Sequence, residues 1–65
     1  MKANIEFIDA GNGFYFKVYK NQAIIYEAAL IQPWNDTCEF ATRVIHSLLP
    51  GIDAKALIEN RVFEG

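Results

Sequence analysis

Alternating apolar and polar positions fill the first part of the chain. Residues 3–9 alternate imperfectly, whereas residues 14–19 alternate cleanly between an apolar and a polar side. A period of two is typical of β-strands that bury one face. Between the two stretches lies Ala10-Gly11-Asn12-Gly13, which is rich in residues that tolerate positive φ. The pattern therefore predicts a β-hairpin.

The register of this hairpin follows from its turn. A two-residue turn at Gly11-Asn12 predicts three cross-strand pairs: Ile5 with Val18, Glu6 with Lys17, and Phe7 with Phe16. The two apolar pairs then share one face of the sheet, and the pair of opposite charges lies on the other face.

A third strand is predicted at residues 23–31, after the polar break at residues 20–22. A two-residue loop at Asn21-Gln22 would turn Glu27 toward the apolar face, where an unpaired carboxylate is costly. A three-residue loop leaves Glu27 outside and directs three side chains inward: Ile24, Tyr26 and Ala28. We therefore expect the three-residue loop.

A helix is predicted from residue 37 to residue 49, followed by the helix-ending pair Pro50-Gly51. Asn35 or Asp36 can cap its N-terminus, and Asp36 with Glu39 resembles a capping box. The apolar stripe at helical spacing consists of Cys38, Ala41, Ile45, Leu48 and Leu49.

The C-terminal part of the chain predicts a second, shorter helix. Asp53 can cap this helix, which covers residues 54–60 and has Leu57 as its main apolar contact. Residues 61–65 either fray or add an edge strand to the sheet.

These elements predict one α+β domain over residues 1–65. Its fold is a three-stranded antiparallel sheet of two hairpins, followed by one main helix and a short C-terminal helix. The expected core between sheet and main helix consists of Phe7, Phe16, Val18, Ala41, Ile45 and Leu48. We expect Trp34 to lie as a lid over the edge of this core.

Composition supports a folded domain without a membrane segment. The 65 residues are 52% hydrophobic and 14% aromatic, far from the composition of disordered chains. No apolar run approaches the roughly 20 residues of a membrane span, and no apolar segment precedes Glu6 as in a signal peptide. A single cysteine suits a reducing compartment, so we expect a cytoplasmic protein.

The residues that carry chemistry predict neither an enzyme nor a metal or cofactor site. The chain has one Cys and one His, whereas a structural metal site needs about four ligands. Cys38 and His46 lie about 12 Å apart along the predicted helix, too far for a nucleophile and its base. The net charge of −2 leaves no basic excess for phosphates, which makes nucleic acid an unfavourable partner.

The outward face of the predicted sheet is the candidate partner-binding surface. One helix covers only one side, which leaves six apolar or tyrosine positions outside: Ile8, Tyr15, Tyr19, Ile25, Ala29 and Ile31. Exposed contiguous apolar surface usually marks an interface. We expect Tyr15, Tyr19 and Ile25 to form its centre, with Glu6 and Glu27 at its margins.

The whole chain resembles the small, acidic, single-domain anti-CRISPR proteins that phages carry, in size, charge and layout. The resemblance implies a non-enzymatic inhibitor in the host cytoplasm that docks on a Cas effector subunit or blocks its DNA binding. Asp36 and Glu39 join the predicted partner-binding residues on this basis. The acidic residues that could stand in for DNA are Glu6, Glu27, Asp36, Glu39 and Glu59.

Two alternative functions remain open. The first is a self-associating accessory domain whose open sheet face forms a homodimer interface. The second is a single-stranded nucleic-acid binder that stacks bases on Tyr15 and Tyr19, since residues 11–19 loosely resemble the aromatic strand of an RNA-recognition motif.

Overall fold

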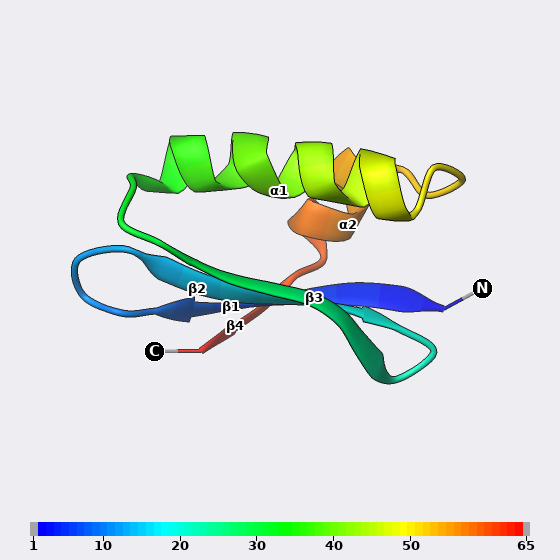
Figure 1. Cartoon of the computed structure of the whole chain (residues 1–65), viewed down its shortest axis with the longest axis horizontal. Coiled ribbons are helices and arrows are strands. Elements are labelled where there is room, and N and C mark those ends of the chain that lie inside the picture. Colours follow the sequence, from blue (N-terminus) through cyan, green and yellow to red (C-terminus); the bar gives the residue numbers. More distant parts are fainter. Residues whose placement is uncertain (1, 65) are drawn as a thin grey trace.

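The computed structural model describes residues 2–64 and confirms the predicted α+β layout. The elements in chain order are β1 (Ala3–Asp9), β2 (Phe14–Lys20), β3 (Ala23–Leu30), α1 (Trp34–Leu48), α2 (Ala54–Glu59) and β4 (Val62–Glu64). The two helices form one layer and the sheet forms the other (Figure 1).

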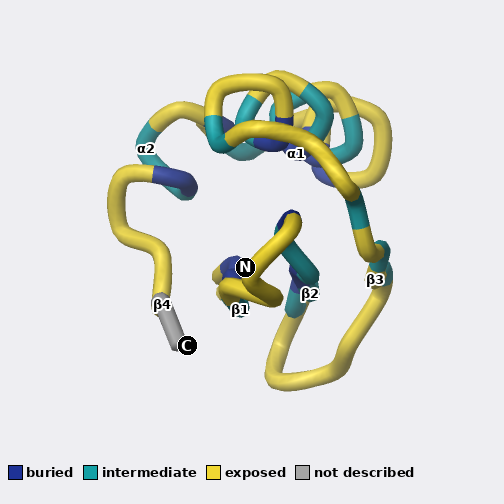
Figure 2. The backbone as a smooth tube through the Cα atoms, turned by 90° about the vertical axis from the view of Figure 1, so that its left-hand side faces the viewer, coloured by how far each residue is buried: buried dark blue, intermediate teal, exposed yellow. Residues whose placement is uncertain are grey.

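In the described residues the sheet has four strands, in the order β3-β2-β1-β4. The hairpins β1–β2 and β2–β3 are antiparallel, as predicted. Of the two alternatives for the C-terminus, the structure has the edge strand: β4 pairs with β1 in parallel. Both helices cover the same face, and no described helix lies under the other face (Figures 1 and 2).

The first hairpin has the predicted register, with Phe7 opposite Phe16 and Glu6 opposite Lys17. Its loop closes where the Ala10 N–H donates to the Gly13 carbonyl at 3.0 Å. Gly11 has φ of 91°, the positive value that a type II′ turn requires at its first central residue.

Gly13 is required for a different reason. A Cβ at this position would overlap the Leu30 carbonyl oxygen and lie 2.8 Å from the Ile31 Cα. These are backbone atoms at the end of β3, which cannot swing aside as a flexible side chain can. The absent side chain therefore lets the first hairpin pack against the end of β3.

The second hairpin corrects the predicted loop length. Its loop has two residues, Asn21 and Gln22, whose φ values of 52° and 71° are typical of a type I′ turn. A β-bulge at Ile25 follows, since Tyr19 pairs with Ile24 and Val18 with Tyr26. The extra residue shifts the alternation by one position.

The bulge gives the outcome that the longer loop was expected to give. Glu27 lies outside, opposite Lys17, while Tyr26 and Ala28 pack against the core. Ile24, which precedes the bulge, does not point inward as predicted: it pairs with Tyr19 and is 47% exposed. The strand also ends at Leu30, so Ile31 lies beyond it.

The N-terminus of α1 differs from the prediction. The helix begins at Trp34 after Pro33, and no side chain caps it, so neither Asn35 nor Asp36 is the cap. Asp36 instead lies within the first turn, where its negative charge interacts favourably with the positive end of the helix dipole.

The buried stripe of α1 follows an i, i+4 spacing through Thr37, Ala41 and Ile45, and Leu49, the residue directly after the helix, continues it. The Thr37 hydroxyl donates to the Pro33 carbonyl at 3.1 Å, which satisfies this buried polar group. Leu48 was predicted in the core, but it is 44% exposed, and Leu49 is buried instead. The other predicted core residues are all fully buried.

Helix α2 packs beside α1 and leads the chain down to β4. The predicted cap is confirmed, because Asp53 accepts hydrogen bonds from the backbone N–H groups of Lys55 and Ala56. Its buried residues are Ala54 and Ile58, whereas Leu57, the expected main contact, is only partly buried.

Candidate partner-binding face

The sheet face without helices, called the outer face below, carries side chains that alternate with the buried core residues of β1 and β2. The strand register places ten of the described side chains on it: Asn4, Glu6, Ile8, Tyr15, Lys17, Tyr19, Ile24, Glu27, Ala29 and Val62. Most of those on β1 and β2 are half-buried by their neighbours, and those on β3 and β4 are exposed.

These side chains form three rows across the strands. The middle row is charged and runs from Glu6 through Lys17 to Glu27, with Val62 beside Glu6. The two flanking rows are mainly apolar or aromatic and consist of Asn4, Tyr19 and Ile24 on one side, and Ile8, Tyr15 and Ala29 on the other. The outer face is thus a charged line between two rows that each carry a tyrosine.

Hydrogen bonds tie each tyrosine to the charged row. The Tyr15 hydroxyl donates to the Glu27 carboxylate, and the Tyr19 hydroxyl donates to Glu6 Oε1 at 3.3 Å. The Lys17 ammonium lies 5.7 Å from the centroid of the Tyr15 ring. These contacts hold the aromatic rings in place before any partner arrives, which lowers the entropy lost on binding.

The carboxylate beside Tyr15 also changes its acidity. The hydrogen bond to Glu27 raises the pKa of the Tyr15 hydroxyl above its ordinary value of 10.0, with smaller contributions from burial and from the charge of Glu27. At neutral pH the Tyr15 hydroxyl therefore remains a hydrogen-bond donor.

The structure brings together four of the seven predicted partner-binding residues on the outer face. Tyr15 and Tyr19 lie on the outer face, but Glu6 and Glu27 lie in its middle row, not at its margins. Ile25 does not lie at the centre of the face as predicted: it is the bulge residue at the β3 edge, outside the three rows, and is 38% exposed.

The other two predicted residues lie elsewhere. Asp36 and Glu39 are exposed on α1, in the helical layer on the opposite side of the sheet. They cannot belong to one flat interface with the outer face.

Sequence reasoning missed Val62. Its place beside Glu6 depends on the parallel pairing of β4 with β1, and the sequence left that strand as one of two alternatives.

Within the described residues, no three His, Cys, Asp or Glu side chains gather where they could hold a metal ion. Burial raises the pKa of the Cys38 thiol above its ordinary value, and the charge of Arg61 opposes part of this rise. None of the described helices is both long enough and apolar enough to cross a membrane.

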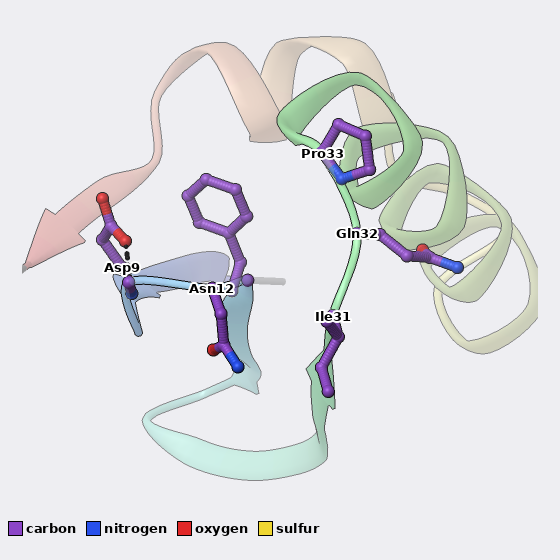
Figure 3. Close-up of a pocket in the computed structure, with 8 residues that line it drawn as sticks. Asp9, Asn12, Ile31, Gln32 and Pro33 are labelled. Atoms are coloured by element: carbon purple, nitrogen blue, oxygen red, sulfur yellow. Dashed lines mark hydrogen bonds between the residues drawn. The ribbon is translucent and has the colours of Figure 1, made fainter.

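A shallow hollow of about 370 Å³ lies between the β1–β2 loop and residues 31–33 (Figure 3). Asp9 lines it, but one oxygen of its carboxylate already accepts from the Gly11 N–H at 2.8 Å. The hollow offers turn residues and Pro33, without a cluster of groups suited to chemistry.

Trp34 closes the edge of the core, as expected for a lid. Its ring packs edge-to-face against Phe7 at 4.7 Å and Phe14 at 5.2 Å between centroids. The Arg61 guanidinium lies 4.8 Å from the Trp34 ring and donates to the Ile58 carbonyl at 3.0 Å. This contact joins the start of α1 to the end of α2.

A second hollow of about 240 Å³, called the edge groove below, lies between β3 and α1. Its lining consists of Tyr26, Phe40, Arg43, Val44, Ser47 and Leu48. No sequence pattern pointed to this groove, because its lining combines one residue of β3 with five residues of α1 that only the fold brings together.

No protein-family model, curated protein or solved structure matches this chain.

Proposed function

We propose that this protein is a non-catalytic protein-binding module that uses the outer face. The single observation that carries the proposal is a sheet face that no described helix covers, on which two hydrogen-bonded tyrosines flank a charged row. Tyrosines are enriched at protein interfaces because they offer large apolar area and a polar end at low entropic cost.

The charges of the outer face favour a protein over a nucleic acid. Among its described residues Lys17 is the one cation, and the carboxylates of Glu6 and Glu27 lie opposite it on the neighbouring strands. A phosphate backbone approaching the tyrosines would meet these carboxylates, whereas stacking proteins combine aromatic rings with a basic groove. A partner with alternating apolar and charged side chains fits the three rows.

The predicted partner class follows from the resemblance to anti-CRISPR proteins, which implies that the partner is a Cas effector subunit. This finer assignment stays a prediction. A non-catalytic inhibitor would act by covering a surface of its target, and the outer face is the surface it would use.

The test is affinity capture with the wild-type chain and with the variant Tyr19→Lys. Lysine keeps an apolar stem on the strand and places its ammonium near Glu6, so the fold should be retained. Loss of a central interface aromatic commonly costs about 2 kcal/mol or more, or about thirtyfold in affinity. We expect the captured protein to be lost from Tyr19→Lys and kept by Lys55→Glu, an exposed position on α2.

Two results would contradict the proposal. One is full capture by a folded Tyr19→Lys variant, and the other is loss of capture by Glu39→Lys instead, which would move the site to α1. Steep weakening of the complex as salt rises, together with recovery of nucleic acid, would favour the single-stranded nucleic-acid alternative.

A further inference from the structure

Strand β3 presents an open edge. It forms one end of the sheet, and in the part of the chain that the structure describes no strand pairs with its other side (Figure 2). Its eight residues contain no proline and no lysine, the residues that commonly protect such edges. Ile24 and Ile25 are 47% and 38% exposed on it.

The edge groove lies directly beside this open strand. Its apolar lining comes from Tyr26 on β3 and from Phe40, Val44 and Leu48 on α1, and Arg43 adds a positive charge. An edge with free backbone groups next to an apolar groove is the arrangement by which sheets accept an additional strand.

We propose that the added strand is β3 of a second copy of this chain, paired antiparallel to form a two-fold symmetric dimer. A two-fold axis perpendicular to the sheet keeps the helices of both copies on the same side, so the two edge grooves face each other. The dimer leaves the outer face open, and the inference therefore does not depend on the proposed function.

The side chains of β3 select one register. An axis at Ala28 places Tyr26 opposite Leu30, Glu27 opposite Ala29, and the exposed Ile25 opposite Ile31, which is 80% exposed just beyond the strand. A shift of this axis by one residue toward the N-terminus would place Glu27 opposite Glu27 of the second copy, a destabilising pair. The chosen register brings apolar side chains together at its inner and outermost pairs, and it places each Glu27 opposite an alanine instead of a second carboxylate.

The charges on α1 agree with the same axis. Phe16 lies opposite Ala28 and 6.0 Å from Phe40 between ring centroids, which makes Ala28 level with Phe40. Similarly, Phe14 lies opposite Leu30 and contacts Trp34, so α1 runs opposite in direction to β3.

Asp36 lies about 6 Å before Phe40 along the helix axis and Arg43 about 4.5 Å after it, on nearly the same helix face. The two-fold axis therefore brings Asp36 of each copy approximately level with Arg43 of the other. Within one chain these two residues are seven positions apart and cannot pair.

The first test measures the mass in solution by light scattering after gel filtration. We expect the wild-type chain to form a dimer of twice 7.4 kDa. Ala29→Glu places a second carboxylate opposite Glu27 at two symmetric positions and should weaken the dimer about tenfold. The matched variant Ala29→Lys places an ammonium there and should remain dimeric. A monomeric wild-type chain at millimolar concentration, or equal effects of both variants, would overturn the proposal.

A second pair of variants keeps the test decisive if Ala29→Glu fails to fold. Arg43→Glu should weaken the dimer, because the carboxylate it introduces and that of Asp36 would then repel each other across the axis. The exchange Asp36→Lys with Arg43→Glu should restore it. A double variant as weak as the single one would contradict the helix register and, with it, the axis at Ala28.

Discussion

Tyr15 and Glu27 show how single side chains set the character of the outer face. They lie on neighbouring strands, and the tyrosine donates its proton to the carboxylate in a hydrogen bond. Their contact depends on Glu27 pointing outward, which the sequence predicted from the cost of burying a carboxylate. That physical reason held, although the geometry that satisfies it is a bulge at Ile25 and not the longer loop.

The pKa of Tyr15 gives a direct test at this scale. In a spectrophotometric titration Tyr15 should ionise above the ordinary value of 10.0, because Glu27 accepts its proton in a hydrogen bond and repels the phenolate. Glu27→Gln should lower this pKa. A folded pKa above the unfolded one means that the folded state holds the proton longer, so this group's stabilising effect is complete below about pH 10 and is lost as pH rises further. An unchanged titration in Glu27→Gln would contradict the assigned contact.

At the scale of elements, turns and helix phase account for both the success and the errors of sequence reasoning. The Gly11-Asn12 turn fixes the first register, and the alternation of residues 14–19 supports the same answer. In α1 the spacing of apolar residues fits both Leu48 and Leu49, and only packing against the sheet and α2 decides for Leu49. The bulge in β3 and the phase of the last turn of α1 depend on tertiary contacts that a local sequence pattern does not contain.

The close approach of the first hairpin to β3 predicts a large effect of one methyl group. Gly13→Ala should lower the free energy of unfolding by about 1–3 kcal/mol, because its Cβ overlaps backbone atoms of Leu30 and Ile31. The matched control is Gly51→Ala, whose Cβ meets nothing within 4 Å and should be nearly neutral. Urea unfolding of both variants measures the difference, and equal midpoints would show that the hairpin does not pack against β3 as described.

The phase of α1 predicts where the core is most sensitive. Ile45→Ala should cost about 2–5 kcal/mol, since this side chain is fully buried between the layers. Lys55→Ala changes an exposed position on α2 and should change stability by less than about 0.5 kcal/mol. Chemical denaturation that ranks the two variants in the opposite order would mean that α1 turns another face to the sheet.

At the scale of the whole molecule, two layers divide the surface into separate regions. The sequence predicted that one helix would leave a sheet face open, and the structure places both helices on the same side. It also separates Asp36 and Glu39 from the tyrosines, a division that composition and charge could not reveal. The edge groove and the pairing of β4 with β1 arise only from the assembled fold, so no sequence motif predicted them.

Site-resolved photo-crosslinking in the cells that make this protein can show directly whether the outer face contacts a partner. A benzophenone amino acid of similar shape replaces Tyr15 or Tyr19 on the outer face, or His46 on the exposed side of α1 as the control. We expect a discrete adduct with one protein from the two tyrosine positions and none from the His46 position. An adduct that forms only from His46, or equally from all three positions, would contradict the assignment of the outer face as the binding surface.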